Sequence, residues 1–341
     1  TRVSWGEGSN WKSPTGKSVN PRKVVVIGAV HPAGISVLQA RSDVEYEIIS
    51  DVSEENLCQA VQKAHGLLVR TAAITAPVIA AAQELEVVSR HGVGYDNVDV
   101  KSLTARGIPL ALAVGGNAVS VAEQTMHLIL ALTKQGFRYD RATREGQFDF
   151  REQPTASCLE GKSLLIIGFG RTGSRVAARA GAFDMDLYAI DPYIDPDIIR
   201  RTAATVVTDL RAILPQMDVV TIHCPKTTET LGLIGREELN AMKPSAILIN
   251  TARGGIINEA DLYQALSSGN IAGAGIDVFE EEPPKLDHPL LGLDNIVLSP
   301  HCAGVTRESR VRVAQIAAQN VLAAFDGTLT AEMVINRAVL Q

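Results

Sequence analysis

Three polar side chains in the second half of the chain have the chemistry needed to reduce a carbonyl group. Arg253, Glu282 and His301 each follow a short apolar run that predicts a β-strand. Ligands of a doubly wound sheet bind at the carboxyl ends of its strands, so the three side chains are expected to converge. An arginine holds a carboxylate and polarises a carbonyl, and a histidine donates a proton near neutral pH. A glutamate that is hydrogen-bonded to an imidazole favours its protonated form. The pattern therefore predicts hydride transfer to a 2-oxo acid.

Each of these residues also has a purely structural interpretation. Arg253 precedes two glycines and could be an ordinary loop residue. Glu282 ends a run of three glutamates, which is typical of a solvated acidic loop, although the two prolines after it restrict its orientation. His301 is one of seven histidines, of which His91 and His223 also border predicted ligand loops. The occurrence of all three residues at predicted strand ends favours the catalytic interpretation.

A nucleotide-binding motif precedes these residues in the chain. The apolar run 164–167 leads directly into Gly168-x-Gly170-x-x-Gly173, and residues 174–182 are compatible with a helix. A second apolar run, 187–190, ends at Asp191, 18 residues past the third glycine. Such a turn presents backbone N–H groups to a pyrophosphate, and the carboxylate binds ribose hydroxyls. A strand, turn and helix without a ligand is the alternative interpretation.

The residues at the end of the second apolar run predict which dinucleotide binds. Asp191 would repel the 2′-phosphate of NADP, and Pro192 and Tyr193 offer no arginine to receive that phosphate. NAD is therefore the predicted cofactor.

The composition limits the classes to which the chain can belong. A length of 341 residues favours two domains, and 46% hydrophobic residues with 21% charged residues suit a globular protein. The net charge of −6 offers no basic surface for nucleic acid. No apolar run approaches the roughly 18 residues of a membrane span, and no secretory leader is expected. Residues 1–20 are expected to be a flexible tail. The four cysteines are scattered, which favours a reduced, cytoplasmic compartment over disulfides or structural zinc: Cys58, Cys158, Cys224 and Cys302.

Apolar runs alternate with helix-compatible segments in both halves of the chain, which predicts an α/β fold with two parallel sheets covered by helices. The expected strands are residues 24–27, 45–49, 66–69, 86–89 and 109–113, and, after the nucleotide motif, 219–223, 246–250, 272–277 and 295–299. The expected helices include residues 54–63, 76–83, 118–134 and Arg307–Phe325. A segment with little periodicity lies at residues 137–154. The turn at residues 28–34 contains glycines, but Pro32 removes a phosphate-facing N–H, so we predict no nucleotide there.

Several longer motifs together resemble the D-isomer-specific 2-hydroxyacid dehydrogenase family. They are residues 168–173 with Asp191, 223–225 with 227–230, 250–255, 277–284 and 299–304, and, upstream, 69–71, 90–97, 116–117 and 122–123. The resemblance extends from about residue 21 to residue 330.

The resemblance implies a role for individual residues. Arg253 would bind and polarise the substrate, His301 would act as the acid and base, and Glu282 would pair with His301. The residues implied to bind NAD are Gly168, Gly170, Arg171, Thr172, Gly173, Asp191, His223, Cys224, Pro225, Thr230, Thr251, Ala252, Arg253, Asp277, His301, Ala303 and Gly304. Among them, Asp277 would meet the nicotinamide carboxamide. The residues implied to bind the substrate are Arg70, Thr71, Ala72, Gly94 and Asn117, together with Arg253 and His301.

The resemblance also implies an architecture. Two doubly wound parallel-sheet domains are expected: a flavodoxin-like substrate-binding domain at residues 21–117 and 305–341, and an inserted Rossmann NAD-binding domain at residues 118–304. A homodimer is implied, with residues 137–154 as its arm.

The substrate is less closely defined. The expected substrate loops contain few cations beyond Arg70, which favours hydroxypyruvate or glyoxylate over the phosphorylated substrate of a D-3-phosphoglycerate dehydrogenase, unless a cation reaches the site from elsewhere. The Glu282-Pro283 pair favours 2-hydroxy acids over formate, and the absence of an aromatic residue at 303–305 disfavours a lactate-type member. A protein that binds NAD(H) as a redox sensor, like the corepressors of this family, is the alternative from another functional class.

Overall fold

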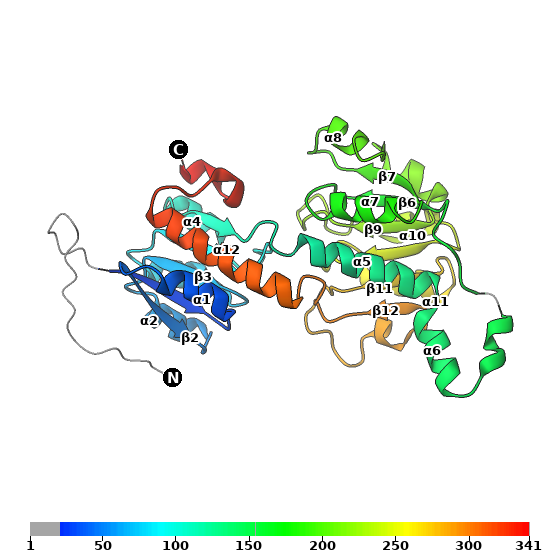
Figure 1. The fold of residues 1–341 in the computed structure, drawn as a ribbon, viewed down its shortest axis with the longest axis horizontal. Helices are drawn as coiled ribbons and strands as arrows, with labels where there is room; N and C mark the ends of the chain where they lie inside the picture. Colours follow the sequence, from blue (N-terminus) through cyan, green and yellow to red (C-terminus); the bar gives the residue numbers. More distant parts are fainter. Residues whose placement is uncertain (1–20, 154, 341) are drawn as a thin grey trace. The chain divides into compact units, whose positions relative to one another are not determined.

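The computed structural model describes residues 21–153 and 155–340, which form two compact units (Figure 1). The first unit runs to Asn117 and resumes at Arg307, and the second unit is Ala118–Thr306. The chain therefore returns to the first unit two residues later than the expected return at residue 305. The flexible tail expected at residues 1–20 lies outside the described residues.

The first unit is built on a sheet of five parallel strands in the order β2-β1-β3-β4-β5. This is the flavodoxin-like order. The strands are β1 (Arg22–Ile27), β2 (Val44–Ile49), β3 (Gly66–Val69), β4 (Val87–Arg90) and β5 (Leu110–Leu112). The helices are α1 (Pro32–Gln39), α2 (Glu54–Ala60), α3 (Ala76–Ala81), α4 (Val100–Ala105) and α12 (Arg307–Phe325), with short 3₁₀ helices η4 (Ala331–Met333) and η5 (Arg337–Leu340).

The second unit has a sheet of seven parallel strands in the order β12-β11-β10-β9-β6-β7-β8. Its strands are β6 (Ser163–Ile167), β7 (Asp186–Ile190), β8 (Thr205–Val206), β9 (Val219–Ile222), β10 (Ile247–Asn250), β11 (Gly273–Ile276) and β12 (Ile296–Leu298). Its α-helices are α5 (Ala118–Thr133), α6 (Gly136–Arg144), α7 (Gly173–Gly181), α8 (Pro196–Arg200), α9 (Leu210–Ile213), α10 (Arg236–Ala241) and α11 (Glu259–Ser267). The 3₁₀ helices are η1 (Phe148–Glu152), η2 (Leu214–Gln216) and η3 (Pro289–Gly292). The predicted α/β class with two parallel sheets is confirmed.

Both sheets are buried on both faces, which explains why their strands are continuous apolar runs. In β1, Val25 and Ile27 pack into the core on one face and Val24 and Val26 into the core on the other. The side chains of β6 alternate between two cores in the same way. The strand ends are consequently held by close packing, and the loops that follow them start from fixed positions.

The segment 137–154, which shows little periodicity in the sequence, is mostly helical. Helix α6 and the short helix η1 extend beyond the end of α5 (Figure 1). Only Ala142 of α6 is buried, so no apolar periodicity marks the helix in the sequence. The two helices are joined by an edge contact between the rings of Tyr139 and Phe150, whose centroids are 5.5 Å apart. Residue 154 lies outside the described residues.

Within the described ranges, no helix is long and apolar enough to cross a membrane. The same residues contain no group of three or more His, Cys, Asp or Glu side chains arranged to hold a metal ion.

Candidate active site

The glycine-rich turn between β6 and α7 is tightly constrained by its own surroundings. Gly168 has φ +92°, and a Cβ there would lie 2.5 Å from the backbone nitrogen of Cys224. A Cβ on Gly173 would lie 2.1 Å from the carbonyl oxygen of Gly168. Gly170 has no heavy atom within 4 Å of such a Cβ. The first and third glycines therefore close the turn, and the second leaves open space above it.

The start of α7 and the end of β7 supply complementary groups beside this turn. Thr172 is the N-cap of α7 but makes no side-chain capping bond, and the first turn of a helix leaves backbone N–H groups without a helical partner. Asp191 accepts the N–H of Phe169 on Oδ2 at 2.8 Å and the N–H of Tyr193 on Oδ1 at 2.9 Å. The carboxylate is thus fixed next to the turn. N–H groups and a fixed carboxylate fit a pyrophosphate and a ribose.

The loop after β9 packs against the same turn. The N–H of His223 donates to the carbonyl of Ile167 at 2.7 Å, and its Nε2 lies 2.9 Å from Oγ1 of Thr221. Its Nδ1 is buried without a hydrogen-bond partner, and burial lowers the pKa of His223 to about 3, so the ring is neutral at pH 7. Thr230 donates its hydroxyl to the carbonyl of Pro225 at 2.6 Å, which closes the loop.

Cys224 lies between His223 and Pro225 in the same loop and is half-buried. Burial raises the pKa of its thiol to about 11. The thiol is therefore protonated and contributes packing rather than charge.

The Arg253 loop after β10 is fixed by hydrogen bonds and by a close backbone contact. Asn250 donates Nδ2 to the carbonyl of Arg253 at 2.9 Å and accepts the N–H of Ala252 on Oδ1 at 3.0 Å. Nη1 of Arg253 donates to the carbonyl of Ala252 at 2.6 Å. A Cβ on Gly254 would lie 1.7 Å from the carbonyl oxygen of Phe279. Only glycine therefore fits where this loop crosses the loop after β11.

Thr251 belongs to the same loop and is buried. Its Oγ1 lies 2.9 Å from Oγ1 of Thr125 in α5. This contact ties the Arg253 loop to a helix of the core.

His301 and Glu282 are in direct contact. Nδ1 of His301 lies 2.7 Å from Oε2 of Glu282, and Oε1 of Glu282 accepts the N–H of Phe279 at 3.0 Å. The side chains remain 47% and 37% exposed, so a ligand can reach them. His301 has φ +50°, a left-handed conformation that is uncommon for a residue with a side chain. With Nδ1 engaged by the carboxylate, Nε2 is the ring nitrogen that can face a substrate.

Asp277 organises the turn that carries His301. The side chain is fully buried. Its Oδ1 accepts the hydroxyl of Ser299 at 2.5 Å and the N–H of Cys302 at 2.9 Å, and its Oδ2 accepts the N–H of Ala303 at 2.9 Å. The sequence motif implied that Asp277 meets a nicotinamide carboxamide. In the structure this carboxylate shapes the turn formed by residues 299–304.

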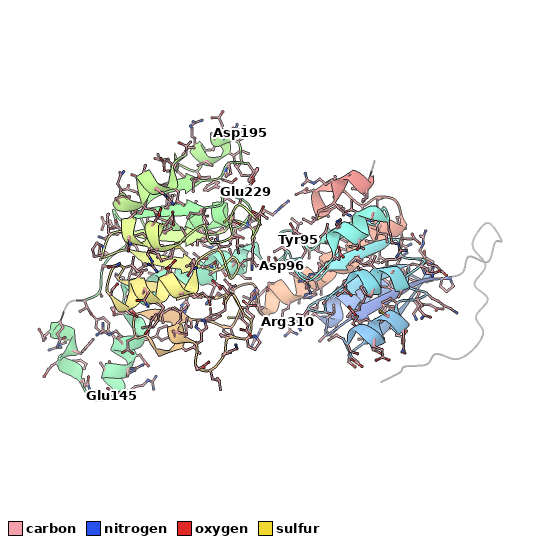
Figure 2. The ribbon with its side chains drawn as sticks, turned by 180° about the vertical axis from the view of Figure 1, so that it is seen from behind. Tyr95, Asp96, Glu145, Asp195, Glu229 and Arg310 are labelled. Atoms are coloured by element: carbon pink, nitrogen blue, oxygen red, sulfur yellow. The ribbon has the colours of Figure 1, made fainter. Side chains whose placement is uncertain are left out.

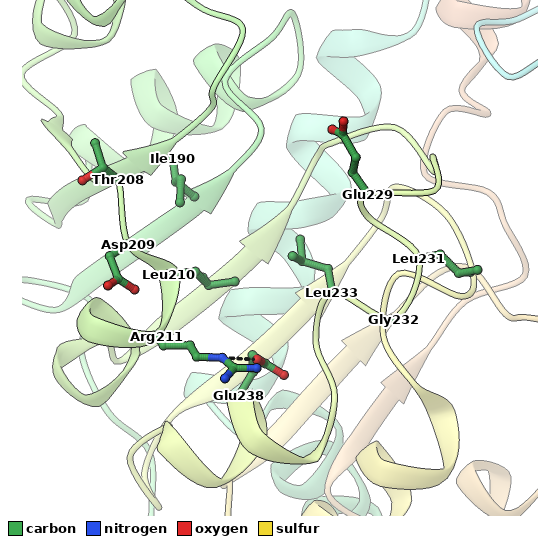
Figure 3. Close-up of a pocket in the computed structure, with 10 residues that line it drawn as sticks. All are labelled: Ile190, Thr208, Asp209, Leu210, Arg211, Glu229, Leu231, Gly232, Leu233 and Glu238. Carbon is green, nitrogen blue, oxygen red and sulfur yellow. Dashed lines mark hydrogen bonds and ion pairs between the residues drawn. The ribbon is translucent and has the colours of Figure 1, made fainter.

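A cavity of about 580 Å³ lies at the end of β7 (Figure 3), and neither Arg253 nor His301 is among its lining residues. Its wall includes Ile190, which directly precedes Asp191, and residues from the segments 208–211 and 229–233. Two further lining residues, Glu229 and Leu231, flank Thr230, which the sequence also assigned to the cofactor. Figure 3 shows Thr208 and Asp209 on one side and Glu229 and Leu231 on the other.

In the first unit, four of the substrate-binding residues implied by the sequence follow two strands: Arg70, Thr71 and Ala72 follow β3, and Gly94 follows β4. Asn97 donates Nδ2 to the carbonyls of Thr71 and Ala72, at 2.9 and 2.6 Å. The carbonyl of Gly94 accepts Nε of Arg90 at 2.7 Å. These bonds fix the two loops.

Arg70 and Asn117 are also in this unit. Arg70 donates from Nη1 to the carbonyl of Ala29 at 3.4 Å. Asn117 is the last residue before the chain leaves the unit, and it is half-buried.

The sequence left the role of His91 open, and the structure places it among positive charges. Its Nε2 is buried without a hydrogen-bond partner. Burial and the charges of Arg70, Arg90 and Arg310 lower the pKa of His91 to about 4. Figure 2 shows Arg310, from α12, and Tyr95 at the same end of the first unit. Arg90 at the end of β4 and Arg310 in α12 thus add positive charge beside His91, in addition to Arg70.

Comparisons with known proteins agree with the dinucleotide-binding class that the glycine turn, Asp191 and the seven-stranded parallel sheet define. Residues 126–303 match the family model described as "D-isomer specific 2-hydroxyacid dehydrogenase, NAD binding domain". A glyoxylate reductase of Thermofilum pendens is 38% identical over 325 residues, which cover 94% of this chain and 96% of that protein. A D-3-phosphoglycerate dehydrogenase of Archaeoglobus fulgidus is 38% identical over 301 residues. These residues cover 88% of this chain but only 56% of the relative, so this chain spans little more than half of its length.

The solved structures include a D-lactate dehydrogenase of Aquifex aeolicus in complex with NAD and lactic acid. It superposes with a TM-score of 0.83 at 28% identity and covers 92% of this chain and 99% of its own. The chain therefore belongs to the D-isomer specific 2-hydroxyacid dehydrogenase family, and the resemblance seen in the sequence is confirmed.

Proposed function

We propose that this protein is an NAD-dependent oxidoreductase that interconverts a small D-2-hydroxy acid and its 2-oxo acid. The observation that carries the proposal is the 2.7 Å contact between His301 and Glu282, with Arg253 on a loop that packs against the same β11 loop. In the reducing direction, Nε2 of His301 gives a proton to the carbonyl oxygen of the substrate. Arg253 binds the substrate carboxylate and polarises the carbonyl. A bound nicotinamide supplies the hydride to C2 of the substrate.

The open space above Gly170 supports the assignment of the cofactor, because a pyrophosphate needs close approach to the backbone. Asp191 supports NAD over NADP, since a fixed carboxylate would repel a 2′-phosphate. The cavity that begins at Ile190 is large enough for the adenine base beside Asp191.

The test is NADH oxidation with hydroxypyruvate, glyoxylate, pyruvate and phosphohydroxypyruvate. His301→Ala should lower kcat about 100-fold or more, because it removes the proton donor, while the variant still binds NADH. Turnover near that of the wild type would exclude His301 as the donor. NADH binding without turnover of any substrate would favour the redox-sensing alternative.

A second candidate, the oxidation of D-3-phosphoglycerate, is favoured by the arginines around His91. The sequence favoured hydroxypyruvate or glyoxylate because the expected substrate loops contain few cations. Arg310 adds a cation near these loops, so the argument against a phosphorylated substrate becomes weaker. Arg310→Gln should then lower kcat/KM for phosphohydroxypyruvate about tenfold or more and leave that for hydroxypyruvate within about twofold. Lys63→Gln is the matched control, because Lys63 follows α2 and therefore lies at the opposite, amino-terminal edge of the same parallel sheet. Equal losses for both substrates would exclude phosphate recognition by Arg310.

We also propose a homodimer formed through α6 and η1. Phe137 and Phe148 are 56% and 65% exposed on these helices, and exposed apolar side chains that lie together mark interaction sites. Light scattering should give a dimer for the wild type and a monomer for the double variant Phe137→Asp, Phe148→Asp. A wild-type monomer at micromolar concentration would exclude the assignment.

A further inference from the structure

A half-buried acid–histidine pair contacts the loop after β11 and has no part in the chemistry assigned so far. Glu259 is the first residue of α11, and its side chain is 13% exposed. His288 directly precedes η3, and its side chain is 21% exposed. Nε2 of His288 lies 2.9 Å from Oε2 of Glu259. An ion pair or charged hydrogen bond of this degree of burial requires a reason, because desolvating it opposes folding.

The pair is tied to the loop after β11 by two reciprocal hydrogen bonds. The N–H of Glu280 donates to Oε1 of Glu259 at 2.6 Å, and the N–H of Glu259 donates to Oε1 of Glu280 at 3.2 Å. The second bond also satisfies one of the N–H groups that the first turn of α11 leaves unpaired. Glu259 therefore fixes the backbone of the loop at Glu280.

The neighbouring residue transmits this position to the candidate active site. The ring of Phe279 meets the ring of His288 edge-on, with centroids 5.8 Å apart. The N–H of Phe279 donates to Oε1 of Glu282, whose other oxygen holds His301. His288, Glu259 and the backbone at 279–280 thus form a continuous set of contacts that ends at the Glu282–His301 pair.

The same backbone segment also determines where the Arg253 loop lies. A Cβ on Gly254 would lie 1.7 Å from the carbonyl oxygen of Phe279 and 2.6 Å from the nitrogen of Glu280. A movement of this segment therefore displaces both Arg253 and Glu282. Misplacement of reacting groups by about 1 Å can lower a rate about 100-fold.

We propose that Glu259 and His288 are positioning residues for the oxidoreductase reaction, and that they act by holding residues 279–280 so that Glu282 meets His301. This inference rests on the proposed function. Neither residue touches substrate or cofactor in this assignment.

The hydrogen bonding of the pair predicts that glutamine can replace Glu259. The amide oxygen of Glu259→Gln can accept the N–H of Glu280. Its NH₂ group can donate to Nε2 of His288 if the ring carries its proton on Nδ1. Nδ1 of His288 is buried without a partner, so this change of tautomer breaks no other hydrogen bond.

The experiment compares Glu259→Ala, Glu259→Gln and His288→Ala with a matched control. Glu237→Ala is that control, because Glu237 is also in the first turn of a helix of this unit but is 73% exposed in a surface ion pair with Arg211. Glu259→Ala should lower kcat about 10- to 100-fold with the Kd for NADH within about twofold. His288→Ala should lower kcat about 3- to 10-fold. Glu259→Gln should keep at least about a third of the wild-type kcat, and Glu237→Ala all of it.

A second measurement follows the Glu282–His301 contact itself. The Nδ1 proton of His301 should give a downfield NMR signal in the wild type, identified by its loss in His301→Ala. Glu259→Ala should lose or shift that signal, and Glu259→Gln should retain it. If Glu259→Ala lowers only the free energy of unfolding, with kcat and the signal unchanged, the pair is structural and the inference is wrong. If Glu259→Ala does not fold, His288→Ala decides by the same two measurements.

The two proposals can fail separately. An absence of turnover with every substrate would contradict the proposed function. The NMR signal would still show whether Glu259 and His288 position His301.

Discussion

β1 and β6 are the first strands of their units in chain order, and each leads directly into a glycine with a positive φ. Gly28 has φ +84° and donates its N–H to the carbonyl of Ile49 at 2.9 Å. Gly168 has φ +92° and donates its N–H to the carbonyl of Ile190, also at 2.9 Å. Both glycines are required because the chain must leave the strand in a left-handed conformation. Up to this residue the two units have the same backbone design.

The turns differ in what happens to the free N–H groups of the following helix. In the first unit, Nδ1 of His31 accepts the N–H of Ala33 at 3.2 Å, and Pro32 removes a further donor. In the second unit, Thr172 makes no capping bond and Gly170 faces open space. The comparison teaches that the two turns differ in side-chain capping: the helix start after β6 has no side-chain cap, which is the arrangement that suits an anion.

The largest expected effect is on NADH affinity, and it should differ between substitutions of Gly168 and Gly28. Gly168→Ala would place a Cβ 2.5 Å from the backbone nitrogen of Cys224, so the turn or the β9 loop must move. We expect the affinity for NADH to fall at least about 100-fold, measured by quenching of protein fluorescence.

Gly28→Ala is the matched control. Its Cβ would meet only Cβ of Arg70, at 3.8 Å, so the main penalty is the positive φ, about 1–2 kcal/mol in the free energy of unfolding. The Kd for NADH should not change. Equal losses of NADH affinity in both variants would contradict the difference between the two turns.

Each unit also has a histidine with a buried ring nitrogen just beyond a strand, which makes the stability of both units depend on pH. An unfolded histidine has a pKa of about 6.5. Burial lowers the pKa of His223 to about 3, and burial with three arginine charges lowers that of His91 to about 4. Below pH 6.5 the unfolded chain binds protons that the folded chain does not. The free energy of unfolding should therefore decrease as the pH is lowered below 6.5, by at most about 1.4 kcal/mol per pH unit for each histidine.

Hydrogen exchange measured between pH 6.5 and 5 can report on each unit separately. His223→Gln should flatten the pH dependence in the second unit, and His91→Gln should flatten it in the first. Because the His91 effect ends near pH 4 and the His223 effect near pH 3, the second unit should continue to lose stability over the wider range. Unchanged slopes in both variants would show that these rings titrate normally in the folded protein.

The sequence predicted the features that depend on local pattern. The apolar runs predicted β3 at residues 66–69 and α12 at Arg307–Phe325 with the bounds that the structure has. The glycine motif predicted the turn after β6, because the steric demands of Gly168 and Gly173 are met within one strand, turn and helix. Helix α6 was missed, since a helix with one buried residue leaves no apolar period.

The site features that the sequence did not predict depend on contacts between distant parts of the chain. The charge of Arg310 acts on His91 only because α12 returns to pack beside β4. Glu259 meets His288 because the segment after β11 folds back onto the start of α11. Neither pair lies within a motif, so spacing along the chain could not reveal them.

A smaller effect on NADH binding is expected from the residue that follows the second strand of each unit. Asp191 follows β7, and the equivalent residue after β2 is Ser50. Asp191→Ser should weaken NADH binding about tenfold, because a hydroxyl replaces the carboxylate that would bind the ribose. It should also reduce the preference for NADH over NADPH at least about tenfold, because the repelling charge is lost. An unchanged preference, measured as the ratio of kcat/KM for the two cofactors, would contradict the role of Asp191 in selecting NAD.

The smallest expected effect belongs to the cap that closes the first turn. His31→Ala removes the acceptor for the N–H of Ala33, so the free energy of unfolding of the first unit should fall by about 0.5–1 kcal/mol in urea titrations. The freed N–H should not create a second nucleotide site, because Pro32 still lacks a donor and Gly34 is held against the carbonyl of Ala314. Titration with NADH should therefore still saturate at a single cofactor per chain. A second binding event in His31→Ala would mean that one capping histidine is all that distinguishes the two turns.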